Sequence, residues 1–220
     1  MQAQQHKLGA LSMEHDFSTP EEFLAFVQGG NDRKSFFDTA LGNPTFHWFF
    51  TQGQDALTQE FYIPGVLSLL NGIEASLRVT VRQIAPDYAD KIELSNYEVL
   101  SNTLLAKAAE AGVPVDALAF PGEGAFMEKV VTKTPVEIVR LRNNICHGNI
   151  LEFIQEVEPG LEILTPECLR PFAANLLDVA YTWAIALAKF RHEKGRRPQD
   201  WPIPNRPENP LSAYLPTSER

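Results

Sequence analysis

Apolar residues recur three to four positions apart along most of the chain, the spacing that places side chains on one face of an α-helix. Between Pro64 and Pro86 this stripe consists of Val66, Leu69, Leu70, Ile73, Leu77 and Val81. Two further stripes consist of Val99, Leu100, Leu104, Leu105 and Ala108, and of Leu176, Leu177, Ala180, Ile185 and Ala188. The pattern predicts an all-α protein, a helical bundle with a few appended segments.

Capping sequences indicate where these helices begin and end. A Ser or Thr stands three residues before a Glu, as in a capping box, at Thr19–Glu22, Ser95–Glu98 and Thr134–Glu137. Glycines follow the expected helices at Gly29-Gly30, Gly112, Gly148 and Gly195. We therefore expect the first helix to stop at Gly29-Gly30, a later one to cover residues 135–147, and the last to lie within 166–193.

Three segments are less regular. Residues 46–50, Phe-His-Trp-Phe-Phe, fit a short strand or a helix and are expected to fill the core. Residues 150–164 fit a short hairpin around Pro159-Gly160. From Gly195 onward the chain is proline-rich and cannot continue a helix, so it should run extended over this subunit or a partner.

These segments suggest three parts. We expect a helical and aromatic extension over residues 1–57 that packs on the core, a helical bundle over 58–194, and an extended proline-rich tail over 195–220. A length of 220 residues is ample for one such core.

Composition and charge narrow the class of protein. The first residues lack the apolar run of a secretory signal, and no apolar run approaches the roughly 18 to 20 residues of a membrane span, so we expect a cytoplasmic protein without membrane contact. The net charge of −9 argues against a protein that grips long nucleic acid with its whole surface. One basic cluster, interpreted as a solvated helix end, consists of Lys189, Arg191, Lys194, Arg196 and Arg197. Cys146 and Cys168 are expected to be reduced thiols packed as small apolar residues.

The segment 135–147 carries polar residues where packing alone would not put them. On a helix its apolar positions form a broad arc, and Arg142 falls inside that arc with Asn143 at its edge. Burial of an arginine at such a position costs several kcal/mol of folding free energy unless its guanidinium is paired or faces a water-filled cavity. His147, the last residue before Gly148, can give and take protons at neutral pH. Together these residue types suit a phosphate site.

Other interpretations of these residues remain open. Roughly one "Arg, four to six residues, His" spacing is expected by chance in such a chain, so the spacing alone is uninformative. Arg142 and His147 also fit a buried salt bridge and a helix-capping histidine. Cys146 is a weak candidate nucleophile, because its neighbour His147 points about 100° away. Acidic residues near His147 lack metal-ligand spacing and fit a solvated loop: Glu152, Glu156 and Glu158.

In this context the segment RLRNNICHGN resembles the HEPN (higher eukaryotes and prokaryotes nucleotide-binding) superfamily. HEPN domains are small helical bundles in which a core helix ends in an Arg-polar-x-x-x-His motif. The likeness covers roughly residues 60–193 in the order of helices, although only the motif is specific. It implies that Arg142, Asn143 and His147 are the functional residues. Arg140 is a supporting candidate, because six residues separate it from His147, a longer spacing that the motif also allows. Glu74 is the other, because it matches an acidic residue on the first core helix of many HEPN domains.

The resemblance implies a homodimer in which two motif helices form one cleft. In active members that cleft cleaves RNA without a metal or other cofactor. The functions it implies are a toxin with an antitoxin or accessory protein, a phage-defence protein, or an RNA-processing enzyme. The alternative is a non-catalytic module that binds a nucleotide, RNA or a protein.

Overall fold

The structure is a computed structural model that describes residues 19–84 and 99–215, and it confirms the predicted all-α class. Seven α-helices and one two-stranded sheet lie within these residues. The α-helices are α1 (Pro20–Leu41), α2 (His47–Thr58), α3 (Tyr62–Ile84), α5 (Asn102–Glu110), α6 (Phe126–Thr132), α7 (Glu137–Cys146) and α8 (Arg170–Glu193). The strands are β1 (Gln155–Glu158) and β2 (Leu161–Ile163), and short 3-10 helices are η1 (Val115–Leu118), η2 (Leu151–Phe153), η3 (Pro166–Leu169) and η4 (Ser212–Tyr214).

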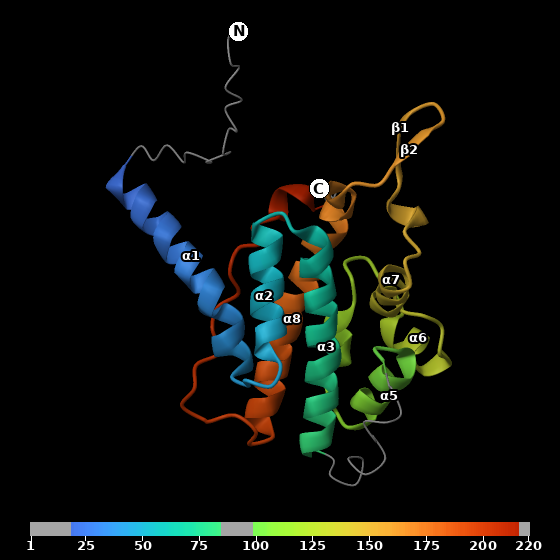
Figure 1. The fold of residues 1–220 in the computed structure, drawn as a ribbon. Coiled ribbons are helices and arrows are strands. Elements are labelled where there is room, and N and C mark those ends of the chain that lie inside the picture. Colours follow the sequence, from blue (N-terminus) through green and yellow to red (C-terminus); the bar gives the residue numbers. More distant parts are fainter. Residues whose placement is uncertain (1–18, 85–98, 216–220) are drawn as a thin grey trace.

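Helices α2, α3 and α8 pack against one another as the centre of the molecule (Figure 1). Helix α1 contacts α2 and α8 on one side of this centre, while α5 and α7 contact α3 on the other. The hairpin β1–β2 projects beyond the body, next to the end of α7.

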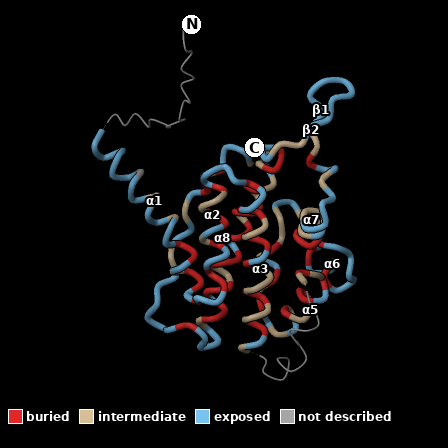
Figure 2. Tube along the Cα trace, in the orientation of Figure 1, coloured by how far each residue is buried: buried red, intermediate tan, exposed pale blue. Residues whose placement is uncertain are grey.

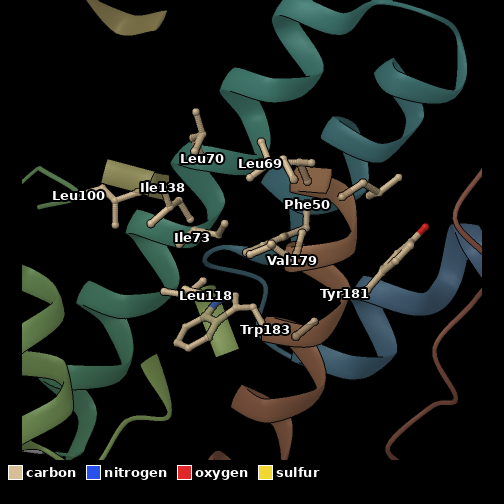
Figure 3. Packing of buried hydrophobic residues seen from close by; sticks show 14 of the residues in the cluster. Phe50, Leu69, Leu70, Ile73, Leu100, Leu118, Ile138, Val179, Tyr181 and Trp183 are labelled. Carbon is tan, nitrogen blue, oxygen red and sulfur yellow. The ribbon is translucent and has the colours of Figure 1, made fainter. Parts of the chain in front are cut away.

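Buried side chains from the central helices meet α7 and η1 in one continuous core (Figure 3). Two polar contacts fix the position of α8 inside it. The indole Nε1 of Trp183 donates to Ser76 Oγ at 2.9 Å, and the hydroxyl of Tyr181 donates to Gln54 Oε1 at 2.7 Å. Because both polar groups are satisfied, these two large rings are buried without the cost of an unpaired donor.

The first helix is longer than predicted. Thr19 forms the expected capping box with Glu22, but α1 runs through Gly29-Gly30 and ends only at Gly42, whose φ is +52°. Its second half contributes Phe36, Phe37, Ala40 and Leu41 to the core. Burial of these side chains stabilises the helix by more than the roughly 1 kcal/mol that each internal glycine costs, so the prediction that the glycines stop it was wrong.

In the aromatic segment 46–50, Phe46 is the N-cap of α2 and the other residues form its first turn, and only part of the segment fills the core. Phe46 and Phe50 are fully buried, whereas Trp48 is 57% exposed and Phe49 is 40% exposed. Helical spacing explains the division, because residues four apart lie near one face. Of the three residues between them, Trp48 and Phe49 turn outward, while His47 is also buried.

The other predicted boundaries hold in part. The hairpin at Pro159-Gly160 is confirmed, with Gly160 at φ +80°, and the last long helix occupies Arg170–Glu193 after one turn of 3-10 helix. Helix α3 starts at Tyr62, close to Pro64, and ends at Ile84. The capping box Ser95–Glu98 lies outside the described residues.

Two members of the basic cluster are buried, contrary to the prediction of a solvated helix end. Arg191 donates to Gln83 Oε1 at 2.7 Å and to Thr80 Oγ1 at 3.4 Å. Arg197 donates to the carbonyl oxygens of Ala40, Thr39 and Pro202. The last carbonyl groups of α1 have no partner within the helix, and two of them accept hydrogen bonds from Arg197. These bonds link the residues after α8 to the N-terminal helix.

The residues after Gly195 cross α1 and α8 with little regular structure. Trp201 Nε1 donates to Thr39 O at 2.9 Å, and Arg206 pairs with Asp178 at 2.5 Å. Asn209 donates to Ala174 O and to Asp178, and Leu211 is buried. This segment thus contacts α1 at Thr39 and α8 at Ala174 and Asp178.

Within the described residues, Pro166–Glu193 is the one helical stretch with the length and mean hydropathy of a membrane span. Most of its apolar window, 61%, is buried inside the protein (Figure 2). Such burial is also what the central helix of a packed bundle requires.

The contact between α2 and α3 depends on glycine. A Cβ at Gly65 would lie 2.6 Å from Leu57 Cδ2 and 3.0 Å from Gly53 O, so Gly65→Ala should lower the free energy of unfolding by about 1–3 kcal/mol. The matched control is Gly29→Ala, where the nearest atom is Arg33 Nη1 at 3.8 Å and a gain of about 0.5–1 kcal/mol is expected. Urea unfolding of both variants measures this. Equal effects at the two sites would contradict the packing described.

Candidate functional site

Helix α7 presents an apolar face to α3 and a polar face to solvent. Ile138, Val139 and Leu141 are buried. The helix covers Glu137–Cys146, slightly less than predicted, and His147 forms its C-cap before Gly148 at φ +71°. The glycine takes the left-handed conformation that commonly ends a helix.

The N-terminus of α7 is capped differently from the prediction. Thr134 makes no capping bond, and the N-cap residue is Val136. The Glu123 carboxylate instead accepts the Glu137 N–H at 2.8 Å and pairs with Lys129 at 3.4 Å. A carboxylate here also complements the positive end of the helix. Sequence reasoning missed Glu123 because it lies in an irregular loop, where no periodicity marks it.

Arg142 lies between the buried and exposed faces with its donors incompletely used. Its side chain is 14% exposed, and Nη2 lies 3.6 Å from Glu74 Oε2. Nη1 donates to Asn143 Oδ1 at 3.4 Å, and the buried Nε has no hydrogen-bond partner. Both distances are long for hydrogen bonds to a group that offers five N–H donors. The Glu74 carboxylate therefore offsets the charge of the guanidinium, but none of the Arg142 contacts is a short hydrogen bond.

Glu74 of α3, the supporting candidate, lies beside Arg142. One carboxylate oxygen accepts the Leu100 N–H at 2.8 Å, and the other lies 3.5 Å from Arg78 Nη1. Its side chain is 16% exposed. Glu74 thus connects α3 both to α7 and to the residues before α5.

Arg140 forms three short hydrogen bonds. It forms a two-pronged pair with Glu137 at 2.9 and 2.7 Å and a further contact with Glu152 at 2.5 Å. These bonds raise the pKa of Arg140 and lower that of Glu137. Glu152 also accepts from Asn144 at 2.6 Å, so two turns of α7 are joined to η2. Arg140 serves as a structural clamp, and Arg142 is the better candidate for ligand contact.

His147 and Asn143 are exposed on adjoining turns at the end of α7. The His147 backbone N–H donates to Asn143 O at 3.0 Å. Within the part of the chain that the structure describes, its imidazole has no hydrogen-bond partner. The structure therefore brings Arg142, Asn143 and Glu74 into contact and leaves His147 at the helix end, open to solvent.

Other chemistry near the site is limited. A surface cavity of about 400 Å³ opens beside Glu123, Lys129 and Glu137, at the opposite end of α7 from His147. Among residues 19–84 and 99–215, no three His, Cys, Asp or Glu side chains come together in a way that could hold a metal ion.

Cys146 is exposed, which contradicts the prediction that both thiols are packed, whereas Cys168 is buried. Because reagent access governs thiol labelling, one thiol should react quickly with a disulfide reagent in the native protein and the second only after unfolding. Cys146→Ser should remove the fast reaction. A second fast thiol would contradict the burial of Cys168, and the absence of a fast thiol would contradict the exposure of Cys146 at the end of α7.

The pair between Glu137 and Arg140 should make stability depend on pH. Because the pKa of Glu137 is lowered on folding, its contribution is present above the unfolded-state pKa and is lost as pH falls through the folded one. Glu137→Gln should therefore be less stable than the parent at pH 7, and the difference should shrink in acid. Urea unfolding from pH 7 to 3 measures it, with the exposed Glu128→Gln as control. A difference that does not shrink at all as pH falls would contradict an ionic origin.

The chain matches no protein-family model, no curated protein and no solved structure.

Proposed function

We propose that this protein is a HEPN-type endoribonuclease, in which Arg142, Asn143 and His147 act on one phosphodiester of RNA. A single observation carries the proposal. Arg142 is largely buried, yet its two contacts are 3.4 and 3.6 Å long. Arg191 and Arg197, whose Nε atoms are likewise without a partner, form bonds of 2.7 and 2.9 Å. A guanidinium used only for packing would be expected to form short bonds, as Arg140 does on the same helix. The open donors suit a phosphate group, which binds arginine in a two-pronged manner.

The proposed reaction is an internal transfer. The ribose 2′-oxygen attacks the neighbouring phosphorus, the bond from phosphorus to the 5′-oxygen breaks, and the products carry a 2′,3′-cyclic phosphate and a 5′-hydroxyl. A histidine accepts the proton of the 2′-hydroxyl, and a proton is delivered to the departing 5′-oxygen. Arg142 stabilises the extra negative charge of the phosphorane between these steps.

The proposed site is shared by two copies of the chain. One His147 per chain can hold one proton at a time, so a second copy across a two-fold axis would supply both the acid and the base. His147 is exposed at the end of α7, which is compatible with such a meeting. With a net charge of −9, the protein would bind RNA through this local site, or with an antitoxin or accessory protein.

The second candidate is a non-catalytic HEPN-like module. The position of Glu74 favours it, because a carboxylate 3.6 Å from Arg142 already offsets the charge that a phosphate would need. Such a module would bind a nucleotide, RNA or a protein partner without cleaving it.

The two candidates are separated by incubating the purified protein with a panel of RNAs in EDTA. Cleavage to 2′,3′-cyclic phosphate ends is expected, and Arg142→Ala and His147→Ala should each lower its rate at least about 100-fold. Arg82→Ala, an exposed arginine on α3, is the matched control and should leave the rate unchanged. Thermal unfolding confirms that each variant is folded.

Intact RNA across the panel would overturn the ribonuclease proposal. RNA binding that survives in the parent and is lost in Arg142→Ala would then support the binding module. Cleavage that persists in both site variants would place the activity elsewhere.

A further inference from the structure

The hairpin of residues 155–163 exposes apolar side chains on a projecting element. Val157 is 58% exposed, Leu161 50% and Ile163 37%, and every residue of both strands is exposed (Figure 2). The two strands pair only with each other, so within the described residues neither outer edge has a strand partner. Open edges with apolar side chains are features that soluble proteins usually cover.

The base of the hairpin is held firmly. Phe153 is 8% exposed and stacks on Phe172 of α8, with the ring centres 5.9 Å apart. Glu152 is bound by Arg140 and Asn144 of α7. The strands are therefore presented at a fixed place on the body.

The hairpin itself is poorly stabilised. An isolated two-stranded hairpin is marginal in water, and here Glu156 stands directly opposite Glu162. Like charges at facing positions destabilise a strand pair. No Lys or Arg occurs between Arg142 and Arg170, although that stretch contains five Glu. The local sequence thus lacks the cation that would offset the repulsion.

We propose that this hairpin is the docking site for a basic, extended segment of a partner protein, which adds as a third strand. Side chains alternate between the faces of a strand, so Leu161 and Ile163 share one face and Glu162 lies on the other with Glu156. A segment that alternates Lys or Arg with β-branched residues matches both faces, while its backbone satisfies the open edge. A second hairpin of this chain and RNA both carry the wrong charge. The inference stands apart from RNA cleavage by α7.

A displayed library of random dodecapeptides, selected on the full chain, tests the proposal. Sequences that alternate basic and β-branched residues should be enriched. Their affinity should fall at least about tenfold for the charge-reversed variant Glu156→Lys/Glu162→Lys. The matched control Glu128→Lys, an exposed site on α6, should bind them as the parent does. Circular dichroism and thermal unfolding verify that the variants are folded.

Three results would overturn the proposal. The first is a selection that yields no peptide, or that yields peptides whose affinity for the charge-reversed variant equals their affinity for the parent. The second is self-association of the parent that the reversed charges abolish, which would make a second copy the occupant. The third concerns RNA. If the Glu side chains repel RNA, the variant with Lys at both positions should bind RNA more tightly than the parent, so a weaker affinity in that variant would contradict the proposal.

Discussion

The position of α7 depends on the pair between Glu74 and Arg142. Without the carboxylate, a guanidinium 14% exposed would have to leave the interface or carry an uncompensated buried charge, which costs several kcal/mol. Glu74 also accepts the Leu100 N–H, so the same side chain fixes the backbone two residues before α5. At 3.6 Å the pair balances charge without a short hydrogen bond. That combination holds the arginine in place and leaves its donors open.

Two arginines two residues apart illustrate how one helix combines stability with a candidate site. Arg140 turns toward Glu137 and Glu152 and forms short charge-assisted bonds with both. Arg142 turns toward α3, and its contacts are longer. With Glu123 capping one end of α7 and the Arg140 clamp on its flank, the helix is fixed along its length, and His147 is left at the free end. A rigid support of this kind is what a site acting on a phosphodiester requires.

The sequence predicted those features that depend on local rules. Apolar periodicity predicted α3 and α8, and the Pro159-Gly160 turn predicted the hairpin, since each is determined by neighbouring residues. The resemblance named Glu74 as a supporting acidic residue on the first core helix, and the structure has it 3.6 Å from Arg142. The failures arose where distant contacts prevailed. Packing of Phe36 and Phe37 carried α1 through two glycines, and a loop carboxylate replaced the Thr134 cap.

Burial of the basic cluster was missed for the same reason. Arg191 and Arg197 each have acceptors more than 100 residues earlier in the chain, in α3 and at the end of α1, and no local pattern identifies them. Exposure of Cys146 followed from the exact end of α7, which depends on Gly148 and on the clamp at Glu152. Tertiary contacts of this type decide which polar residues become structural and which stay available.

The central claim is that Arg142 holds open donors for a phosphate. The most direct test follows the Nε–H signal of Arg142 by nuclear magnetic resonance, assigned from its loss in Arg142→Lys, while a 2′-O-methyl dinucleotide is added. The account predicts a saturable shift of that signal, with the signal of Arg140 unchanged. An Arg142 signal that stays fixed at saturating dinucleotide would contradict it.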